Sequence, residues 1–591
     1  MPTASQPPDD PHGRAAATYH DAVDQPGANR IDGSPAARAV LALLLFAFGA
    51  YQSVLFFGHT VTPHPDMWPF VRTGHELLAF ETPTSFKRAP LVGLLQAGLS
   101  RCMPRPHPDL TAAWLLNAML HPLSVVLLWL VARRIVGQAG FWVALLASIN
   151  PWLVYMLTEG IAETTLLFFV LATCYFVLRH SRWSYLFACL AMMARYDAAL
   201  LLILAFAADI AHSKTARRRV WAVVAAALAA LPLAIWLLAT WSLWDAQGQT
   251  HYLKELGAAS GGRIVLAECV AALWRVAFYP LLVPPIQLSD NAAVLFYGMA
   301  KILAALIFAL GIFHIARRRQ WAVLALAGLL AAYLLVHAAH SFVYPRFFVI
   351  VHWIALAICA AGLQLVANKL AGLIRPPQLR SVLVLFSMIV ALAWVVWLAR
   401  YLPQIAPVCP PSASLPYVAV ALIALVCLLS TAASGARHAL PNLAKAAWVA
   451  LMVVSNQFVL VPTVGDGLRN SEFRQLADWY AGTAQPGEAL ACSQPGMLRI
   501  LAPGRAADLV HFESIKADTL DQFTQECRAK GIAYVAWDSR VGLYPRTRSY
   551  RLWHMARLVL LGEPRDVGPY QFITQLRHGR QFINVFRLQP P

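Results

Sequence analysis

Residues 184–211 read SYLFACLAMMARYDAALLLILAFAADIA, a 28-residue apolar stretch interrupted by Arg195-Tyr196-Asp197. Basic clusters flank it at residues 179–182 and 214–219. Cytoplasmic loops of membrane proteins retain Lys and Arg, so both ends of the stretch should lie on the cytoplasmic side. The chain must then go out and return in too few residues for two full crossings of about 20 residues each. We predict two short helices joined by a charged turn at the outer face, where protein or water satisfies the exposed backbone.

The composition places this stretch in an integral membrane protein. Of the 591 residues, 59% are hydrophobic and 13% are charged, whereas about a quarter of the residues in soluble domains are charged. The formal net charge is +18, but the Lys and Arg residues stand in short clusters between apolar runs, and a nucleic-acid binder would gather them on one face. Such clusters orient membrane helices, so we expect the lipid bilayer as a partner and no nucleic acid.

Further apolar runs of near-membrane length lie on both sides of this stretch, and together they predict an α-helical polytopic protein with about thirteen transmembrane helices. The predicted spans begin near residues 37, 112, 139, 160, 184, 198, 220, 293, 321, 347, 381, 417 and 446. The basic clusters fit cytoplasmic loops only if the spans between them come in pairs. This parity places residues 58–111, 242–292, 339–346, 400–416 and everything after 462 outside.

Three regions follow from the composition. Residues 1–36 are rich in Pro, Asp, Gly and Ala without an apolar period, which predicts a disordered cytoplasmic tail. Residues 37–462 form the predicted transmembrane domain, with a large first outer loop at 58–111. Residues 463–591 have a soluble composition and are predicted to be a small extracytoplasmic α/β domain. The cytoplasmic membrane of a bacterium is the expected location.

Short elements are predicted within the C-terminal region. Helical periodicity covers residues 471–483 and 518–530, and strand patterns cover residues 489–492, 507–512 and 532–537. The region carries no glycine-rich nucleotide-binding pattern. Cys492 and Cys527 are the one pair there that we predict as a candidate disulfide in an oxidising compartment.

Ionisable groups at membrane depth are costly and are therefore functional candidates by default. On the predicted topology, candidates from five separate segments fall on the outer side. Asp66 follows the first span, and Glu159 and Glu163, one helical turn apart, flank the tight turn before residue 164. The remaining candidates are Lys87, Arg88, Arg195, Asp197, His340, Tyr344 and Arg346. We expect these carboxylates and cations to converge on one membrane interface.

That combination suits transfer of a sugar from a lipid-phosphate carrier. A carboxylate can take the proton of the acceptor hydroxyl, and cations can stabilise the departing phosphate. The donor would be a polyprenyl-phosphate-linked sugar, whose apolar tail enters from the bilayer. The acceptor would be a lipid, a glycan or a protein of the cell envelope.

Each candidate also has a purely structural interpretation. Asp66 after Pro65 is typical of a turn, Arg88 of an interfacial cation with a buried stem, and Glu163 of a carboxylate stabilised at a helix N-terminus. Arg195 and Asp197 are spaced to pair with each other. No certain cofactor is indicated, and a divalent metal stays open because the histidines near Asp66 match no strong metal-binding spacing.

The residues resemble the type C (GT-C) glycosyltransferases, the polytopic group that includes protein O-mannosyltransferases and the aminoarabinose transferase of lipid A. The resemblance covers roughly residues 37–400, and the soluble domain after the last span is similar to the layout of the aminoarabinose transferase. His64-Pro65-Asp66 is similar to the acidic motif of the family's first outer loop, which implies Asp66 as catalytic base. Residues 88–91, Arg-Ala-Pro-Leu, resemble the family's Lys-Pro-Pro-Leu, which implies that Arg88 binds phosphate.

Three later segments also resemble the family. Residues 150–169 are similar to its hairpin of Pro, an acidic residue and apolar residues, residues 191–200 to its Leu-Thr-Arg-Pro-Glu turn, and residues 344–348 to its Arg-Tyr span start. The sequence departs from the family where Met67 follows Asp66 in place of a second acidic residue. The base is therefore open between Asp66, Glu159 and Glu163, and the phosphate contact between Lys87 and Arg88.

Our leading hypothesis is an inverting glycosyltransferase. Asp66 acts as general base, and Glu159 and Glu163 position the acceptor or the sugar, as do Asp197 and His340. The carrier phosphate is bound by Lys87, Arg88, Arg195, Tyr344 and Arg346. The alternative is a secondary transporter of a polar or anionic solute, since broken helices and intramembrane charges are also typical of transporters. The sequence lacks a convincing internal repeat, which disfavours a transporter.

Overall fold

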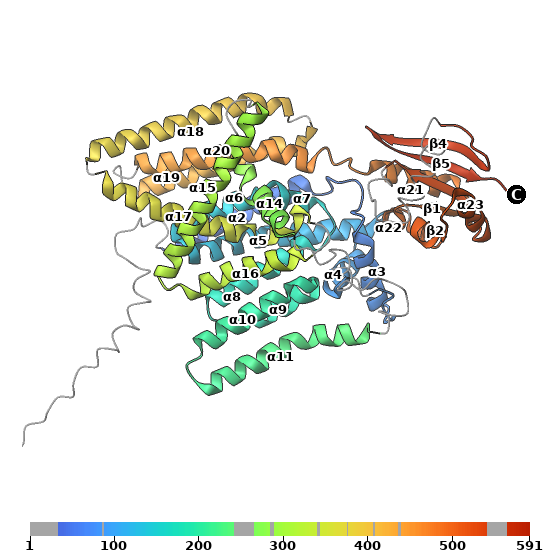
Figure 1. Ribbon diagram of the computed structural model, residues 1–591, viewed down its shortest axis with the longest axis horizontal. Helices are drawn as coiled ribbons and strands as arrows, with labels where there is room; N and C mark the ends of the chain where they lie inside the picture. The colour runs from blue at the N-terminus through green and yellow to red at the C-terminus, as the bar shows by residue number, and fades with distance from the viewer. Residues whose placement is uncertain are drawn as a thin grey trace, which may run out of the picture.

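The computed structural model describes residues 34–85, 88–241, 265–283, 289–339, 343–374, 376–405, 408–434, 439–539 and 564–590. A bundle of apolar helices is followed by a small α/β domain at one end of the bundle (Figure 1). Nine helical segments in the described part of the chain are long and apolar enough to cross a membrane. The predicted class, a polytopic helical membrane protein with a C-terminal α/β domain, is confirmed, and the count of about thirteen passes stays a prediction.

The helices follow the predicted apolar runs in order, except that the helix Leu266–Ala277 lies within the segment 242–292, which was predicted as a loop. The first half contains α2 (Pro35–Phe56), α5 (Pro108–Val136), α6 (Gly140–Ser148), α7 (Pro151–Thr158), α8 (Glu163–Leu178), α9 (Trp183–Ala194), α10 (Ala199–His212) and α11 (Ala216–Ala239). The second half contains α14 (Leu266–Ala277), α15 (Asp290–Arg317), α16 (Trp321–Ala338), α17 (His352–Leu373), α18 (Pro377–Ile405), α19 (Leu415–Ser434) and α20 (Ala439–Val464). The predicted span starting near residue 139 is two helices, because Pro151 lacks a backbone N–H and Asn150 caps the new helix by accepting from Trp152 N.

The stretch at 184–211 folds as predicted. Helix α9 ends at Ala194, Arg195 is extended (φ −154°, ψ 139°), and one short 3-10 turn, Tyr196–Ala198, leads into α10. The extended residue breaks the helix and lets the Arg195 and Asp197 side chains meet. The charged turn therefore stands between two helices that are both shorter than a full crossing.

Residues 58–111, the predicted first outer loop, contain two helices whose close packing fixes the positions of Asp66 and Arg88. Helix α3 (Met67–Leu78) begins directly after Asp66, and α4 (Pro90–Ser100) begins two residues after Arg88. Gly74 and Gly93 face each other so closely that a Cβ on Gly74 would lie 2.0 Å from the Gly93 carbonyl oxygen. Small residues allow backbones to approach in this way, and the approach brings the starts of the two helices together.

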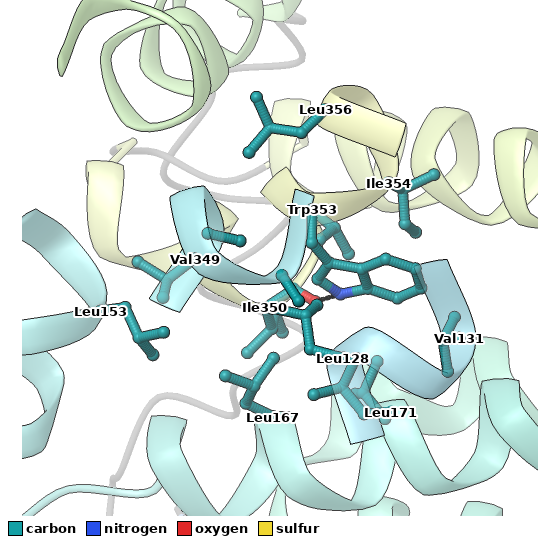
Figure 2. Close-up of a cluster of buried hydrophobic side chains, with 14 of the residues drawn as sticks. Leu128, Val131, Leu153, Leu167, Leu171, Val349, Ile350, Trp353, Ile354 and Leu356 are labelled. Carbon is teal, nitrogen blue, oxygen red and sulfur yellow. Dashed lines mark hydrogen bonds between the residues drawn. The ribbon is translucent and has the colours of Figure 1, made fainter. Parts of the chain in front are cut away.

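A buried indole supports the segment that carries Arg346. The 3-10 helix η5 (Pro345–Ile350) precedes α17, and Trp353 Nε1 donates a hydrogen bond to the Ile350 carbonyl oxygen (2.9 Å). Figure 2 shows the indole among aliphatic side chains of α5 and α8, including Leu128 and Leu171. Truncation of a buried side chain of this size typically lowers the free energy of unfolding by ~3–5 kcal/mol. The indole thereby anchors η5 against the bundle.

The C-terminal domain is a mixed sheet with helices. Its elements are α21 (Ser471–Thr483), β1 (Ala489–Cys492), α22 (Pro495–Leu501), β2 (Leu509–His511), α23 (Leu520–Ala529), β3 (Ile532–Asp538), β4 (Tyr570–His578) and β5 (Gln581–Leu588). The strand order is β2-β1-β3-β5-β4, with β1 parallel to β2 and β3, and β5 antiparallel to β3 and β4. The predicted elements between residues 471 and 538 are present, and the β4–β5 hairpin was not predicted.

The predicted disulfide between Cys492 and Cys527 is wrong, because both thiols are free and buried. Cys492 packs with Leu490 and Leu498 in one hydrophobic core, and Cys527 packs with Phe523 in another. Alternate side chains of β1 point to opposite faces of the sheet. The sheet therefore separates the two sulfurs.

The domain is joined to the first outer loop through a shared hydrophobic core. Met67 and Val71 of α3 belong to the same buried cluster as Met497 and Leu498 of α22. The Arg499 guanidinium lies 5.6 Å from the centre of the Trp68 ring. Because α3 begins directly after Asp66, the C-terminal domain packs on the helix that positions this residue (Figure 1).

We expect Gly74→Ala to destabilise the protein by about 1–3 kcal/mol, because the new methyl group would overlap the backbone of α4. Thermal unfolding of the purified protein in detergent measures the effect. Gly98→Ala, in the partner helix α4, is the matched control, since nothing lies within 4 Å of its Cβ position. Alanine has the better helix propensity there, so a control that destabilises as much as Gly74→Ala would contradict the close-packing argument.

Candidate active site

Asp66 stands between two guanidinium groups. Its Oδ1 accepts a hydrogen bond from Arg88 Nη2 (2.9 Å), and its Oδ2 accepts one from Arg346 Nη2 (2.8 Å). His64 Nε2 accepts a hydrogen bond from Arg346 Nη1 (2.8 Å), because a guanidinium can only donate. The first outer loop and the start of η5, 280 residues apart in the sequence, therefore meet at this carboxylate.

A second carboxylate continues the network inward. Glu163, at the start of α8, lies 3.4 Å from Arg195 Nη1 and 3.9 Å from Arg346 Nε. Its side chain is 7% exposed. Arg195 and Arg346 also lie over the Phe347 ring, at 5.5 and 5.6 Å from its centre. Glu163 and this ring thus hold two guanidinium groups side by side.

The third carboxylate ends the network. Asp197 binds Arg195 through two hydrogen bonds, at 3.2 Å from Nε and 2.8 Å from Nη2. Its Oδ2 also accepts from the Tyr333 hydroxyl (3.0 Å) and lies 3.3 Å from His337 Nε2. The paired fork geometry fixes the plane of the Arg195 guanidinium. Asp197 is therefore an orienting partner of Arg195.

Opposite charges balance within this network. Arg88, Arg195 and Arg346 supply three positive charges, and Asp66, Glu163 and Asp197 supply three negative ones. Removing one member of a buried pair leaves an uncompensated charge, which typically costs about 3–5 kcal/mol.

The surrounding charges also set the protonation of Asp66 and His64. Burial by itself would raise the pKa of Asp66, but the charges of Arg88 and Arg346 outweigh it, and the pKa is lowered. Burial, together with the charge of Arg346, lowers the pKa of His64 to about 3. Asp66 is thus an anion with a low proton affinity while the two guanidinium groups hold it, and His64 is neutral.

Glu159 behaves differently from the other carboxylates. It lies in the turn between α7 and α8, is 4% exposed, and its pKa is raised to about 7 by burial. Arg469, Arg346 and a hydrogen bond from Tyr155 lower the pKa only in part. A carboxyl group with a pKa near neutrality can hold or release a proton at physiological pH.

The structure brings most of the predicted site residues together. Those that form one connected ion-pair network are Asp66, Arg88, Glu163, Arg195, Asp197 and Arg346. Glu159 lies close enough to interact electrostatically with Glu163 and Arg346. Tyr344 lies at the rim, 46% exposed, with the Arg346 guanidinium 5.5 Å from its ring centre. Lys87 and His340 lie outside the described residues.

Four residues of the site were not among the predicted ones: Tyr155, Tyr333, His337 and Arg469. His337 could have been predicted from the sequence, because an ionisable residue inside an apolar span is a functional candidate. Tyr333 stands one turn before it on the same face of α16. Arg469 follows the last span, and its local sequence gives no indication of a functional role. Its contact with Tyr155 depends on tertiary structure alone.

The site gives no direct sign of a metal centre. Among the described residues, no group of three or more His, Cys, Asp and Glu side chains could hold a metal ion. His64 and Asp66, which we considered as ligands, are engaged by arginines.

Comparison with solved structures identifies the architecture. ArnT from Cupriavidus metallidurans, bound to undecaprenyl phosphate, matches 94% of this chain and 100% of its own, with 14% identity and a TM-score of 0.52. The oligosaccharyltransferase of Archaeoglobus fulgidus in the apo form matches 86% of this chain and 70% of its own, with 13% identity and a TM-score of 0.51. The chain has a GT-C fold. No protein-family model and no curated protein matches the sequence.

The GT-C fold explains why the candidates converge. Each of them lies in a connection or at the start of a helix: Asp66 before α3, Arg88 before α4, Glu163 at the first position of α8, Arg195 between α9 and α10, and Arg346 in η5. Their ion pairs bring these five segments together. The GT-C fold thus gathers short loop segments around one charged site.

We expect Glu159→Gln to change the pH dependence of stability. The pKa of Glu159 is higher in the folded protein (about 7) than its ordinary value of 4.5, so the folded state binds the proton more tightly and loses stability as the pH rises between these values. Relative to wild type, the variant should gain up to about 3 kcal/mol between pH 5 and pH 8. Thermal unfolding across this range measures the gain.

Glu268→Gln, which removes an exposed carboxylate from α14, is the control and should follow wild type across the range. A Glu159→Gln curve parallel to that of wild type would show that Glu159 is not protonated by burial.

Proposed function

We propose that the protein is a glycosyltransferase that moves a sugar from a polyprenyl-phosphate carrier to a cell-envelope lipid, glycan or protein. The observation that carries the proposal is the position of Asp66, a carboxylate held by Arg88 and Arg346 at the centre of a charged site in a GT-C fold. The structural neighbour ArnT was solved with undecaprenyl phosphate bound. A base beside cations is the combination that this transfer requires.

The carrier phosphate would bind to Arg88 and Arg346, with Arg195 behind them. Arg88 Nε is buried and has no hydrogen-bond partner among the described residues, so its N–H is available to donate to a phosphate oxygen. Phosphate oxygens match the fork of a guanidinium as well as a carboxylate does. The incoming phosphate and Asp66 would therefore compete for the same donors.

This competition gives Asp66 its role as general base. When the phosphate takes over the guanidinium donors, the carboxylate loses the charges that lower its proton affinity. The acceptor oxygen then attacks the anomeric carbon of the sugar and its proton passes to Asp66. The bond from that carbon to the phosphate oxygen breaks, and the lipid phosphate leaves with the bonding pair. Attack opposite the leaving group inverts the anomeric centre.

The other carboxylates have supporting roles in this proposal. Asp197 orients Arg195, and Glu163 holds Arg195 and Arg346 side by side. Glu159 and Glu163 would face the sugar or the acceptor. The divalent metal that the sequence left open has no role in these steps.

We propose that the site faces the extracytoplasmic side. Helix α8 has Glu163 at its first position and Arg179 directly after its last residue. In α5, Asn117 donates a hydrogen bond to the Glu159 carbonyl oxygen, and Arg133-Arg134 lie in the last turn. Lys and Arg mark the cytoplasmic ends of membrane helices. The C-terminal domain packs beside Asp66 and would help to recruit the acceptor. A transporter would place its charged site near the middle of the membrane, so the position at a bundle end favours the transferase.

The lipid-phosphate site is tested directly by binding of undecaprenyl phosphate to the purified protein in nanodiscs. If Asp66 competes with phosphate for the guanidinium groups, Asp66→Asn should bind about tenfold more tightly than wild type, because a charge-assisted hydrogen bond is worth about 1.5 kcal/mol. Arg88→Ala should bind more weakly, and Glu268→Gln should match wild type. Weaker binding by Asp66→Asn would contradict the competition, and no binding by wild type would refute the lipid-phosphate site.

The transferase activity is tested in cells. Deletion of the protein should remove a sugar from the cell envelope, as seen by mass spectrometry of lipids, glycans and proteins. Re-expression of wild type or Glu268→Gln should restore the sugar, and Asp66→Asn or Arg88→Ala at equal protein levels should not. Restoration by both site variants would refute their assigned roles.

A further inference from the structure

The segment that joins the bundle to the C-terminal domain makes close backbone contacts and hydrogen bonds with the first outer loop. Residues 465–469 follow α20, with Gly467 in a left-handed conformation (φ +78°). A Cβ on Gly467 would lie 2.0 Å from the His59 carbonyl oxygen. Gly467 O accepts from Val61 N (3.1 Å), and Arg469 O accepts from the Thr62 hydroxyl (2.7 Å). These contacts fix the backbone just before Arg469 and at its own carbonyl group.

The Arg469 side chain extends from this segment to helix α7. Its Nη1 donates a hydrogen bond to the Tyr155 hydroxyl (2.8 Å), and its guanidinium lies 5.7 Å from the centre of the same ring. Tyr155 is 7% exposed. A guanidinium cannot accept, so the hydroxyl receives this hydrogen bond and keeps its own proton to donate.

Glu159 follows Tyr155 by one helical turn at the end of α7, so the Tyr155 hydroxyl and the Glu159 carboxyl lie close enough to interact. The chain of contacts therefore runs from Arg469 through Tyr155 to Glu159, next to the ion-pair network. We propose that Arg469 is a positioning residue, which fixes the Tyr155 hydroxyl and through it the Glu159 carboxyl, and so makes the segment between α20 and α21 part of the site. This rests on the proposed function in that Glu159 faces the sugar or the acceptor.

The surroundings of Glu159 show why the positive charge of Arg469 matters. The charged or titratable groups that face it are Tyr155 on α7, Arg346 in η5, Glu163 on α8 and Arg469 after α20. Arg346 is shared between Asp66 and Glu163, whereas Arg469 has no carboxylate ion-pair partner among the described residues. Loss of the Arg469 charge would leave Glu159 protonated at neutral pH, because burial and Glu163 both disfavour its anion.

The proposal is tested by infrared titration of the full-length protein in detergent, which needs neither donor nor acceptor. The band of the protonated Glu159 carboxyl is identified by its loss in Glu159→Gln, and its midpoint is followed with pH. Arg469→Gln should raise the midpoint by about one pH unit or more, since an opposite charge nearby shifts a carboxyl by that amount. Arg469→Lys, which keeps the charge, should stay near wild type.

Tyr155→Phe is the second variant, because it keeps the ring under Arg469 and removes only the hydroxyl that links Arg469 to Glu159. Its midpoint should also rise. Equal midpoints in wild type, Arg469→Gln and Tyr155→Phe would overturn the proposal and leave Arg469 as a structural link. The infrared result is independent of lipid-phosphate binding, so failure of the proposed function would show in the binding and cell experiments and not in the infrared titration.

Discussion

A charge buried among apolar helices is stable only when an opposite charge or a hydrogen bond compensates it, and this requirement organises the site. Three arginines and three carboxylates meet where five connections of the bundle come together, and each carboxylate contacts at least one guanidinium. The pairing keeps the charges at the end of the bundle in the absence of a ligand. It also leaves them arranged to exchange one anion, a carboxylate, for another, a phosphate.

The rest of the fold holds the members of this network in place. The contact between Gly74 and Gly93 brings the starts of α3 and α4 together, and with them Asp66 and Arg88. Trp353 anchors η5 and thereby Arg346. The C-terminal domain shares a hydrophobic core with α3. Packing among apolar groups far from the chemistry thus determines the distances between the charged ones.

This arrangement shifts the pKa values of two carboxyl groups in opposite directions. Asp66 faces two guanidinium groups, which lower its pKa, whereas burial raises the pKa of Glu159 to about 7. Carboxyl groups whose environments push their pKa values apart are suited to different tasks at one pH. Asp66 becomes basic only when its arginines are engaged elsewhere, and Glu159 can carry a proton at rest. The segment at 465–469 places the positive charge of Arg469 near Glu159.

The sequence by itself determined the membrane class, the order of the helices and the interrupted hairpin at 184–211, because hydrophobic length and the placement of Lys and Arg act locally along the chain. It also indicated that Asp66, Arg88, Glu163, Arg195 and Arg346 belong together, since their spacing from span ends places them on one side. Only the tertiary structure decided how Asp66 and Glu163 pair with the arginines, that Cys492 and Cys527 lie on opposite faces of the sheet, and that Arg469 reaches Tyr155. These features depend on contacts between segments tens to hundreds of residues apart, for which periodicity and local spacing carry no signal.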